Sequence, residues 1–250
     1  MSAIAVCSGK GSPGATFVAV NLAVAMARTR ERVMLIDLDP AGGDIAAYLG
    51  LGPKKGLYPL LQMERSLPDL AVIEREAEER LGVFAVGGFP VEATPESRVA
   101  LPALLLRLRG YPGDVVADIG RVGEASAATA SHADLVVLVV RPDLVSVLGA
   151  ERALRALNQA GVARDKVRIF VSGAERRRPG DIAEVATALK VEVVGSIPFA
   201  RKAARRSLVQ QAPIAKGHLL KAFGELASTI LGSETPDAAP ASADLIGVPA

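Results

Sequence analysis

Short runs of β-branched residues alternate with helix-like stretches along this chain as far as about residue 231. This alternation constrains the fold more than any other feature, because it is the pattern of repeated βαβ units and a mostly parallel sheet. Most of the runs are apolar at successive positions, as expected for strands that are covered on both faces. We therefore expect one three-layer α/β domain over residues 1–231, with helices on both faces of a mostly parallel sheet.

The hydrophobic pattern also sets the expected boundaries of the elements. Strands are expected at Ala3–Cys7, Val33–Asp37, Val83–Val86, Val115–Asp118, Leu135–Val140, Val167–Val171 and Val191–Ile197. Helices are expected at Thr16–Ala27, Glu96–Arg109, Val145–Ala160, Gly180–Leu189 and Gly217–Leu231.

Composition narrows the functional classes. Half of the 250 residues are hydrophobic, which is enough to bury a sizeable core. Aromatic residues make up only 4% and Trp is absent, which argues against a carbohydrate-binding or base-stacking surface. The single cysteine, Cys7, provides neither a disulfide framework nor a cysteine metal site. We expect a cytoplasmic protein without a signal peptide or a membrane span.

Positive charge is concentrated in one part of the sequence. Residues 141–232 carry 16 Lys and Arg against 8 Asp and Glu, although the whole chain has a net charge of only +2. Such clusters mark either a solvated face or contact with a polyanion, here DNA or an acidic membrane surface. The basic residues concerned are Arg176, Arg177, Arg178, Arg201, Lys202, Arg205 and Arg206. Residues 232–250 are rich in Pro, Ala, Ser and Asp, so we expect a disordered acidic tail there.

A glycine-rich loop follows the first expected strand. Its sequence, GKGSPG at residues 9–14, satisfies G-x-G-x-x-G and is followed by acidic residues at the end of the second strand, which is the Rossmann dinucleotide pattern. The same residues fit G-K-G-x-x-G-x-T, in which backbone N–H groups hold phosphate oxygens and Thr16 offers a hydroxyl to Mg²⁺. Both interpretations imply phosphate binding.

Carboxylates at two strand ends separate these interpretations. Asp37 and Asp39 end the run VMLIDLDP, and Asp118 ends the run DVVAD. Phosphoryl transfer uses carboxylates near a metal ion, whereas a Rossmann site needs only one acidic residue on the ribose. The carboxylate at the second strand end, Asp118, therefore favours a site for a nucleoside triphosphate.

Several stretches in this order resemble one family. SGKGSPGAT, VMLIDLDPAGGDIAAYLGL, DVVADIG, ADLVVLVVRPD with GAERAL, and VVGSIPF look like the deviant-Walker-A ATPases of the ParA/MinD group. Within that group they are most similar to CpaE/TadZ-type, MinD-like proteins with a degenerate P-loop. The resemblance covers about residues 2–231.

The resemblance implies a P-loop fold that binds ATP and Mg²⁺ and forms a dimer face to face around two nucleotides. It implies that Lys10 reaches the partner's phosphates, that Thr16 ligates Mg²⁺, and that Asp39 positions the attacking water. It places Asp118 at the Walker B position, so that Thr16, Asp39 and Asp118 surround the metal. The loop residues expected to hold the nucleotide are Gly9, Lys10, Gly11, Ser12, Pro13, Gly14, Ala15, Thr16 and Phe17.

The chain departs from the family pattern at three places. Ala15 stands where the family has a second lysine, and Ser172 and Gly173 stand where it usually has an asparagine. No proline follows soon after Asp118. Loss of a charged hydrogen bond of roughly 1.5–3 kcal/mol would weaken phosphate binding about ten- to a hundredfold. We therefore expect weak or absent hydrolysis.

Taken together, the sequence predicts a cytoplasmic ATP-dependent dimerisation switch that positions a cellular assembly and works with a protein partner. Peripheral placement at a membrane or nucleoid fits the basic clusters. One alternative is a non-catalytic scaffold that keeps the fold without using nucleotide. A second alternative is an NAD(P)-dependent Rossmann enzyme.

Overall fold

The computed structural model describes residues 1–11, 13–52, 56–57, 61, 67–88, 94–174, 180–214 and 217–232. Its strands are β1 (Ala3–Ser8), β2 (Val33–Asp37), β3 (Glu78–Arg80), β4 (Val83–Val86), β5 (Asp114–Arg121), β6 (Leu135–Val140), β7 (Val167–Ser172) and β8 (Val193–Ile197). Its α-helices are α1 (Ala15–Met26), α2 (Ile45–Leu49), α4 (Leu70–Glu76), α5 (Pro95–Leu108), α6 (Glu124–Ala130), α7 (Leu144–Gln159), α8 (Gly180–Leu189), α9 (Arg201–Gln210) and α10 (His218–Leu231). A short 3-10 helix, η1 (Arg164–Lys166), precedes β7.

Within the described residues the strands form one sheet in the order β3-β4-β2-β5-β1-β6-β7-β8. Only β3 and β4 pair antiparallel, and the other neighbours are parallel. In the common Rossmann order the strand before the glycine loop lies beside the second strand. Here β5 separates β1 from β2, so the sheet order speaks against the Rossmann alternative.

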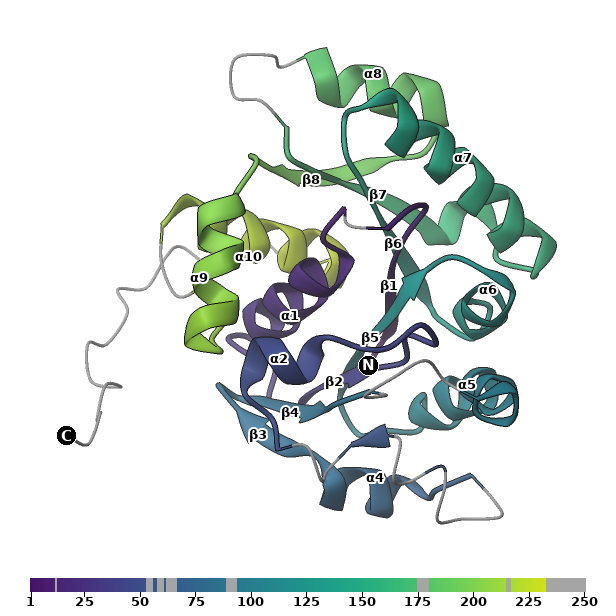
Figure 1. Cartoon of the computed structure of the whole chain (residues 1–250), viewed down its shortest axis with the longest axis vertical. Helices are drawn as coiled ribbons and strands as arrows, with labels where there is room; N and C mark the ends of the chain where they lie inside the picture. The colour runs from purple at the N-terminus through teal and green to yellow at the C-terminus, as the bar shows by residue number, and fades with distance from the viewer. Residues whose placement is uncertain are drawn as a thin grey trace.

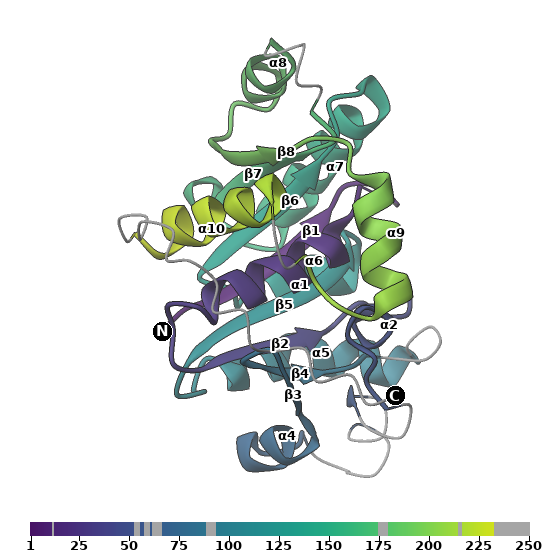
Figure 2. The ribbon, with the colours of Figure 1, turned by 90° about the vertical axis from the view of Figure 1, so that its left-hand side faces the viewer.

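Helices cover both faces of this sheet, and β1 contributes to both cores. Ile4 and Val6 pack in the cluster formed with α1 and α10, whereas Ala3, Ala5 and Cys7 pack in the cluster formed with α5, α6 and α7. The alternation follows from the two-residue period of a strand. Figures 1 and 2 show α1 and α10 on one side of the sheet, and α5, α6 and α7 on the other. The expected three-layer α/β fold is confirmed.

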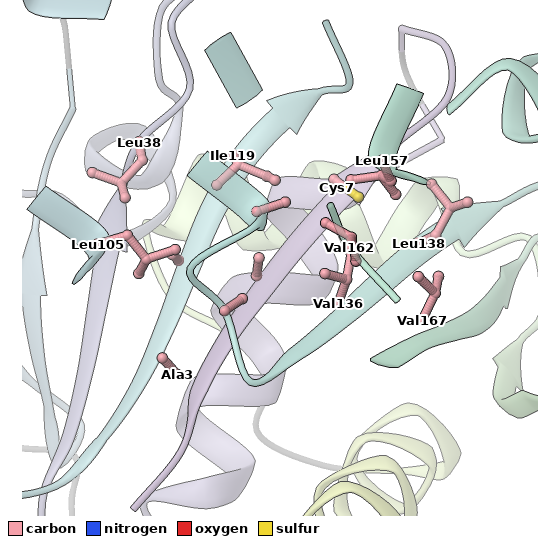
Figure 3. Packing of buried hydrophobic residues seen from close by; sticks show 14 of the residues in the cluster. Ala3, Cys7, Leu38, Leu105, Ile119, Val136, Leu138, Leu157, Val162 and Val167 are labelled. Carbon is pink, nitrogen blue, oxygen red and sulfur yellow. The ribbon is translucent and has the colours of Figure 1, made fainter. Parts of the chain in front are cut away.

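Figure 3 shows the second of these clusters around Cys7, which lies close to side chains from β6 and α7. Cys7 is fully buried, and desolvation by burial, together with the nearby charge of Asp118, raises the pKa of its thiol well above its usual value. The thiol therefore stays protonated and acts as a small apolar group in the core.

The expected strands and long helices are confirmed to within a few residues at their ends. Helix α9 was not predicted as an element, because its sequence RKAARRSLVQ contains four cations and few large apolar residues and was interpreted as a surface cluster. The short elements α2, α4, β3 and α6 were not predicted either. Among the described residues, no helix is long and apolar enough to cross a membrane.

Buried Asn21 holds the chain segment after α9 against α1. Its Nδ2 donates a hydrogen bond of 2.7 Å to the Phe17 carbonyl oxygen, and its Oδ1 accepts one of 2.8 Å from the Ile214 backbone N–H. Both polar ends of the side chain are therefore satisfied, as a buried amide requires. This contact fixes the C-terminal end of α9 relative to the helix that follows the glycine loop.

Helix α10 ends at Leu231, and Gly232 follows it in the left-handed conformation with φ 64°. Glycine is the residue that adopts this conformation without strain at a helix end. The rest of the expected tail, residues 233–250, lies outside the described residues, as do Arg176, Arg177 and Arg178. The division at residue 231 and the disordered tail stay predictions.

Replacing Phe223 of α10 by Ala should destabilise the fold. Phe223 is 1% exposed, and its ring centroid lies 5.9 Å from that of Phe170 and 5.8 Å from that of Phe17. Removing a buried ring costs about 3–5 kcal/mol, to be measured by urea unfolding. The control is Val209→Ala, at a side chain that is 75% exposed, which should change stability by less than about 0.5 kcal/mol. Equal effects of both substitutions would contradict the packing described for α10.

Candidate functional site

The glycine loop connects β1 to α1 and ends in a left-handed residue. Gly14 has φ 92° and caps α1, and its carbonyl oxygen accepts a 3.0 Å hydrogen bond from the Val18 N–H. Only glycine adopts this backbone conformation readily, so Gly14 allows the chain to turn directly into the helix. Of the expected loop residues, Ser12 lies outside the described residues.

The first residue of the loop packs against the backbone of α7. A Cβ atom on Gly9 would lie 2.3 Å from the carbonyl carbon of Gly149, and one on Gly149 would lie 3.1 Å from the Gly9 oxygen. Two glycines are thus needed for the close approach. Because Lys10 follows directly and is half-buried, α7 also sets where its side chain begins.

The N-terminus of α1 is open to an anion. No side chain caps it, and its first turn contains no acidic residue. Uncapped N–H groups and the positive end of the helix dipole attract phosphate oxygens. Ala15, the first residue of the helix, is 7% exposed, and Thr16 beside it is half-buried. This geometry fits a phosphate cradle.

Three parallel strands bring the carboxylates to this loop. In the sheet, Asp118 of β5 pairs with Val6 of β1 on one side and with Asp37 of β2 on the other. Both carboxylates are fully buried. Because the carboxyl ends of parallel strands lie at one edge, the carboxylates from two strands gather beside the N-terminus of α1.

Asp118 carries an incompletely satisfied carboxylate. Burial raises its pKa to about 6, and the negative charges of Asp39 and Asp44 also raise it. The Thr16 hydroxyl and the Gly120 N–H lower it, the latter through a 3.0 Å hydrogen bond to Oδ1. Although Thr16 is close enough to act on the carboxylate, Oδ2 has no hydrogen-bond partner among the described residues.

This orphaned oxygen fits a divalent cation. Magnesium is usually held by one or two carboxylates together with phosphate oxygens and waters, and not by a complete cage of protein groups. Asp118 and Thr16 would hold Mg²⁺ here, and the cation would neutralise charge on the phosphates. Consistent with this partial ligand set, no group of three or more His, Cys, Asp or Glu in the described part of the chain could hold a metal.

Asp37 organises the loop after β2. Its Oδ1 accepts a 3.2 Å hydrogen bond from the Asp39 N–H, and its Oδ2 accepts one of 3.0 Å from the Ile45 N–H. Burial and the charge of Asp118 raise its pKa well above the usual value, and the two N–H donors oppose that shift. A Cβ atom on Gly43 would lie 2.0 Å from its Oδ2, so the loop wraps closely around this carboxylate.

Asp39 lies over the backbone just beyond Asp118. A Cβ atom on Gly120 would lie 2.2 Å from the Asp39 Cγ, and Gly120 itself has φ 63°. Burial raises the pKa of Asp39, whereas a 2.8 Å hydrogen bond from the Ala41 N–H lowers it. The structure thus brings Thr16, Asp39 and Asp118 close together. Their role as a metal site stays a prediction.

A cleft of about 670 Å³ opens beside the loop. Its walls come from the loop, from α1, α2 and α9, from the last residues of β7 and β8, and from the segments that follow β6 and β8. The lining residues are Pro13, Gly14, Phe17, Tyr48, Arg141, Ser172, Ile197, Phe199, Ala200, Arg201, Lys202, Ala204, Arg205 and Leu208. Clefts of this size hold small ligands and cofactors.

The sequence interpretation did not identify Arg141 and Phe199 as site residues. The Arg141 guanidinium lies 5.1 Å from the centre of the Phe199 ring, which is itself 61% exposed. Both residues follow strands whose carboxyl ends meet the loop, and this position was the signal that could have found them. Ser172 was noted only as a departure from the family pattern, and its Oγ lies 3.8 Å from where a Cβ on Gly14 would be.

Comparison with known proteins identifies the class. Residues 4–214 match the family described as the CobQ/CobB/MinD/ParA nucleotide binding domain. The chain therefore belongs to this family.

Two relatives illustrate the range of similarity. The antiactivator FleN of Pseudomonas aeruginosa is 30% identical over 165 residues, which are 62% of this chain and 56% of FleN. An uncharacterized ATP-binding protein of Methanocaldococcus jannaschii is 26% identical over 93% of this chain and 88% of its own length.

Solved structures show the same fold. The cell division protein MinD of Aquifex aeolicus superposes with a TM-score of 0.76 at 20% identity, covering 94% of this chain and 99% of MinD. The septum site-determining protein MinD of Pyrococcus horikoshii, complexed with Mg-ADP, gives a TM-score of 0.73 at 19% identity and covers 92% and 95%. The chain thus has the MinD/ParA P-loop fold.

The buried carboxylate should make stability depend on pH. Since the pKa of Asp118 is about 6 in the folded protein and about 3.9 in the unfolded chain, its proton stabilises the fold below about pH 4. That contribution is lost as the pH rises through 6. Without ligand, Asp118→Asn should therefore be more stable than the parent at pH 7, by on the order of 3 kcal/mol, and the difference should shrink toward pH 4.

Chemical denaturation at a series of pH values measures this effect. The control is Asp69→Asn, because the Asp69 side chain is 85% exposed and its substitution should change stability little at any pH. An Asp118→Asn variant whose stability follows the parent's between pH 4 and 7 would mean that the carboxylate is not held in an unfavourable environment.

Proposed function

We propose that this protein binds Mg-ATP and acts as an ATP-dependent dimerisation switch that positions a cellular assembly, with weak or absent hydrolysis. The observation that carries the proposal is the unpaired Oδ2 of buried Asp118 beside Thr16, at the open N-terminus of α1. A bound metal ion and triphosphate would satisfy both features. The nucleotide-binding family and the Mg-ADP held by MinD of Pyrococcus horikoshii support the choice of ligand.

Each site residue then has a defined role. The backbone of Gly9–Gly14 and the first turn of α1, which includes Phe17, hold the phosphates. Thr16 and Asp118 hold Mg²⁺, and Asp39, which lies against Gly120, positions the attacking water. Lys10 reaches the phosphates bound by the partner subunit. These assignments follow the resemblance to the ParA/MinD group and to its CpaE/TadZ-type members.

Weak hydrolysis follows from the missing cation. With Ala15 at the start of α1, the loop lacks a positive charge that would act on the β- and γ-phosphates, where charge develops during transfer. The non-catalytic scaffold is the alternative that this absence favours. ATP-dependent association separates the two proposals, because a scaffold would show the same oligomeric state with and without nucleotide.

An exposed apolar patch beside the loop supports face-to-face dimerisation. Leu144, Val145 and Leu148, on the first turns of α7, are 73%, 58% and 43% exposed. The residue that follows them, Gly149, touches Gly9. A dimer across this face would bury the patch and bring each Lys10 toward its partner.

The assembly that is positioned, the protein partner and the cytoplasmic location, peripheral at membrane or nucleoid, stay predictions. Contact of Arg201, Lys202, Arg205 and Arg206 with DNA or an acidic membrane also stays a prediction. In the structure three of these four residues line the cleft beside the loop.

Calorimetry with Mg-ATP and NAD tests the ligand. We expect Mg-ATP to bind more tightly than NAD, and removal of Mg²⁺ to weaken ATP binding. Asp118→Asn should also weaken Mg-ATP binding, because it removes the negative charge that faces the metal. Tighter binding of NAD, or ATP binding that is indifferent to Mg²⁺ and to Asp118, would overturn the assignment.

Ala15→Lys should strengthen Mg-ATP binding about ten- to a hundredfold and raise the rate of hydrolysis. A lysine in the first turn can extend to the phosphates, where a charged hydrogen bond contributes roughly 1.5–3 kcal/mol. Ala15→Met is the matched control, since it adds similar length without charge at a nearly buried position. If a folded Ala15→Lys protein binds ATP no better than the parent, the loop does not hold phosphates, and the scaffold alternative is correct.

Leu144→Asp and Leu148→Asp should prevent Mg-ATP-dependent dimerisation, because each places a negative charge in the apolar patch on α7. Analytical ultracentrifugation with and without Mg-ATP measures the outcome. Val99→Asp is the control, since Val99 is 80% exposed on α5 and does not belong to the patch on α7, so its substitution should leave the dimer intact. A dimer that persists in both α7 variants would show that subunits associate through another face.

A further inference from the structure

We propose that Arg201, Lys202 and Arg205 of α9 bind the phosphates of the nucleotide and supply the positive charge that is absent at position 15. This inference rests on the proposed function, since it assigns residues to the same nucleotide. It concerns a helix that the sequence pattern did not predict and that the loop motif does not include.

The first observation is that one cleft joins this helix to the loop. Pro13 and Gly14 of the loop line the cleft together with Arg201, Lys202 and Arg205. A ligand that sits at the N-terminus of α1 and extends into this space of about 670 Å³ would share the cleft with the long cationic side chains of α9. Figure 2 shows α9 standing across the sheet edge at which α1 begins.

The second observation is the charge of α9. Its ten residues include four cations and no carboxylate, and all four cations are exposed. Among the described residues no ion pair neutralises Arg201, Lys202 or Arg205. Arg141, which also lines the cleft, differs from them because it pairs with Asp143 at 3.6 Å. Uncompensated cations around a cleft raise the local concentration of an anionic ligand.

The third observation is that the helix is held in place. Asn21 of α1 accepts the hydrogen bond from Ile214 just after α9, and buried Ser207 within α9 donates to the Ala212 carbonyl oxygen. The helix that carries the cations is thus attached to the helix that would hold the phosphates. A pre-positioned charge loses less conformational freedom on binding than one on a free loop.

The arrangement of the four cations provides an internal control. Arg201 and Arg205 are one helical turn apart, so they lie on the same face of α9. Both residues line the cleft, as does Lys202. Arg206 belongs to the same helix and carries the same charge, but it does not line the cleft. A general effect of the charge of α9 would involve Arg206 equally, whereas direct phosphate contact would not.

The test measures affinity by calorimetry for adenosine, ADP and ATP, the nucleotides with Mg²⁺. We expect Arg201→Ala/Arg205→Ala to weaken ATP binding at least tenfold, ADP binding less, and adenosine binding not at all. Lys202→Ala should weaken ATP binding about threefold or more. Arg206→Ala should change each affinity less than twofold. Equal losses for adenosine and ATP, or an equal loss in Arg206→Ala, would overturn the inference.

A double-mutant cycle tests the replacement of the missing lysine. Adding Ala15→Lys to Arg201→Ala/Arg205→Ala should restore more affinity than the same change adds to the parent, because both cation sets act on one phosphate chain. Purely additive effects would show that α9 and position 15 act on different parts of the ligand. They would contradict the inference that the α9 cations supply the charge absent at position 15.

The outcomes also separate this inference from the proposed function. If the parent protein binds no nucleotide, the proposed function and the inference about α9 are both wrong. If the parent binds Mg-ATP and Asp118→Asn weakens that binding while the α9 variants do not, only the inference about α9 falls. If instead these variants lose binding to duplex DNA or to anionic vesicles and keep full ATP affinity, the cations serve a macromolecular surface and the inference is wrong.

Discussion

The pairing of β5 between β1 and β2 is the constraint on which the rest of the site depends. Its register places Asp118 opposite Val6 on one side and opposite Asp37 on the other. Because β1 runs directly into the glycine loop, this pairing sets a carboxylate beside the first turn of α1. If β5 lay elsewhere in the sheet, the loop and the acidic residues would be separate features, and no metal site could be inferred from them.

That pairing also forces two carboxylates into the interior. Asp37 offsets its burial by accepting hydrogen bonds from the Asp39 and Ile45 backbone N–H groups, whereas one oxygen of Asp118 has no partner among the residues that the structure describes. A buried polar atom without a partner costs free energy, so its retention at a loop suited to phosphate points to a ligand that satisfies it. The two aspartates thus differ in their surroundings, since Asp37 is held by the loop after β2 and Asp118 has an oxygen free for the proposed ligand within the described part of the chain.

Sequence patterns predicted the elements whose hydrophobic residues recur at a regular spacing. Apolar runs located the central strands to within a few residues, and the glycine loop with its strand-end carboxylates indicated the candidate site. They could not predict α9, because its side chains are cationic and exposed and its position depends on a contact between Asn21 and Ile214, 193 residues apart. Nor could they show that Gly9 touches Gly149 or that Asp39 lies on Gly120, since such contacts exist only after the chain has folded.

The basic residues of α9 also lie far from the loop in the sequence but close to it in the folded structure. Along the sequence, Arg201, Lys202 and Arg205 belong to a cationic region almost two hundred residues beyond Ala15, and they suggested a surface for a large polyanion. In space they line the cleft that begins at Pro13 and Gly14. A loop with Ala15 in place of a lysine can still attract phosphate when a neighbouring helix carries uncompensated cations. The electrostatic attraction depends on distance and solvent exposure and not on which element carries the charge. Charge supplied from outside the loop would hold the nucleotide without being aligned with the transferring phosphoryl group. Such an arrangement would account for the proposed nucleotide-dependent switch, which binds ATP and hydrolyses it slowly.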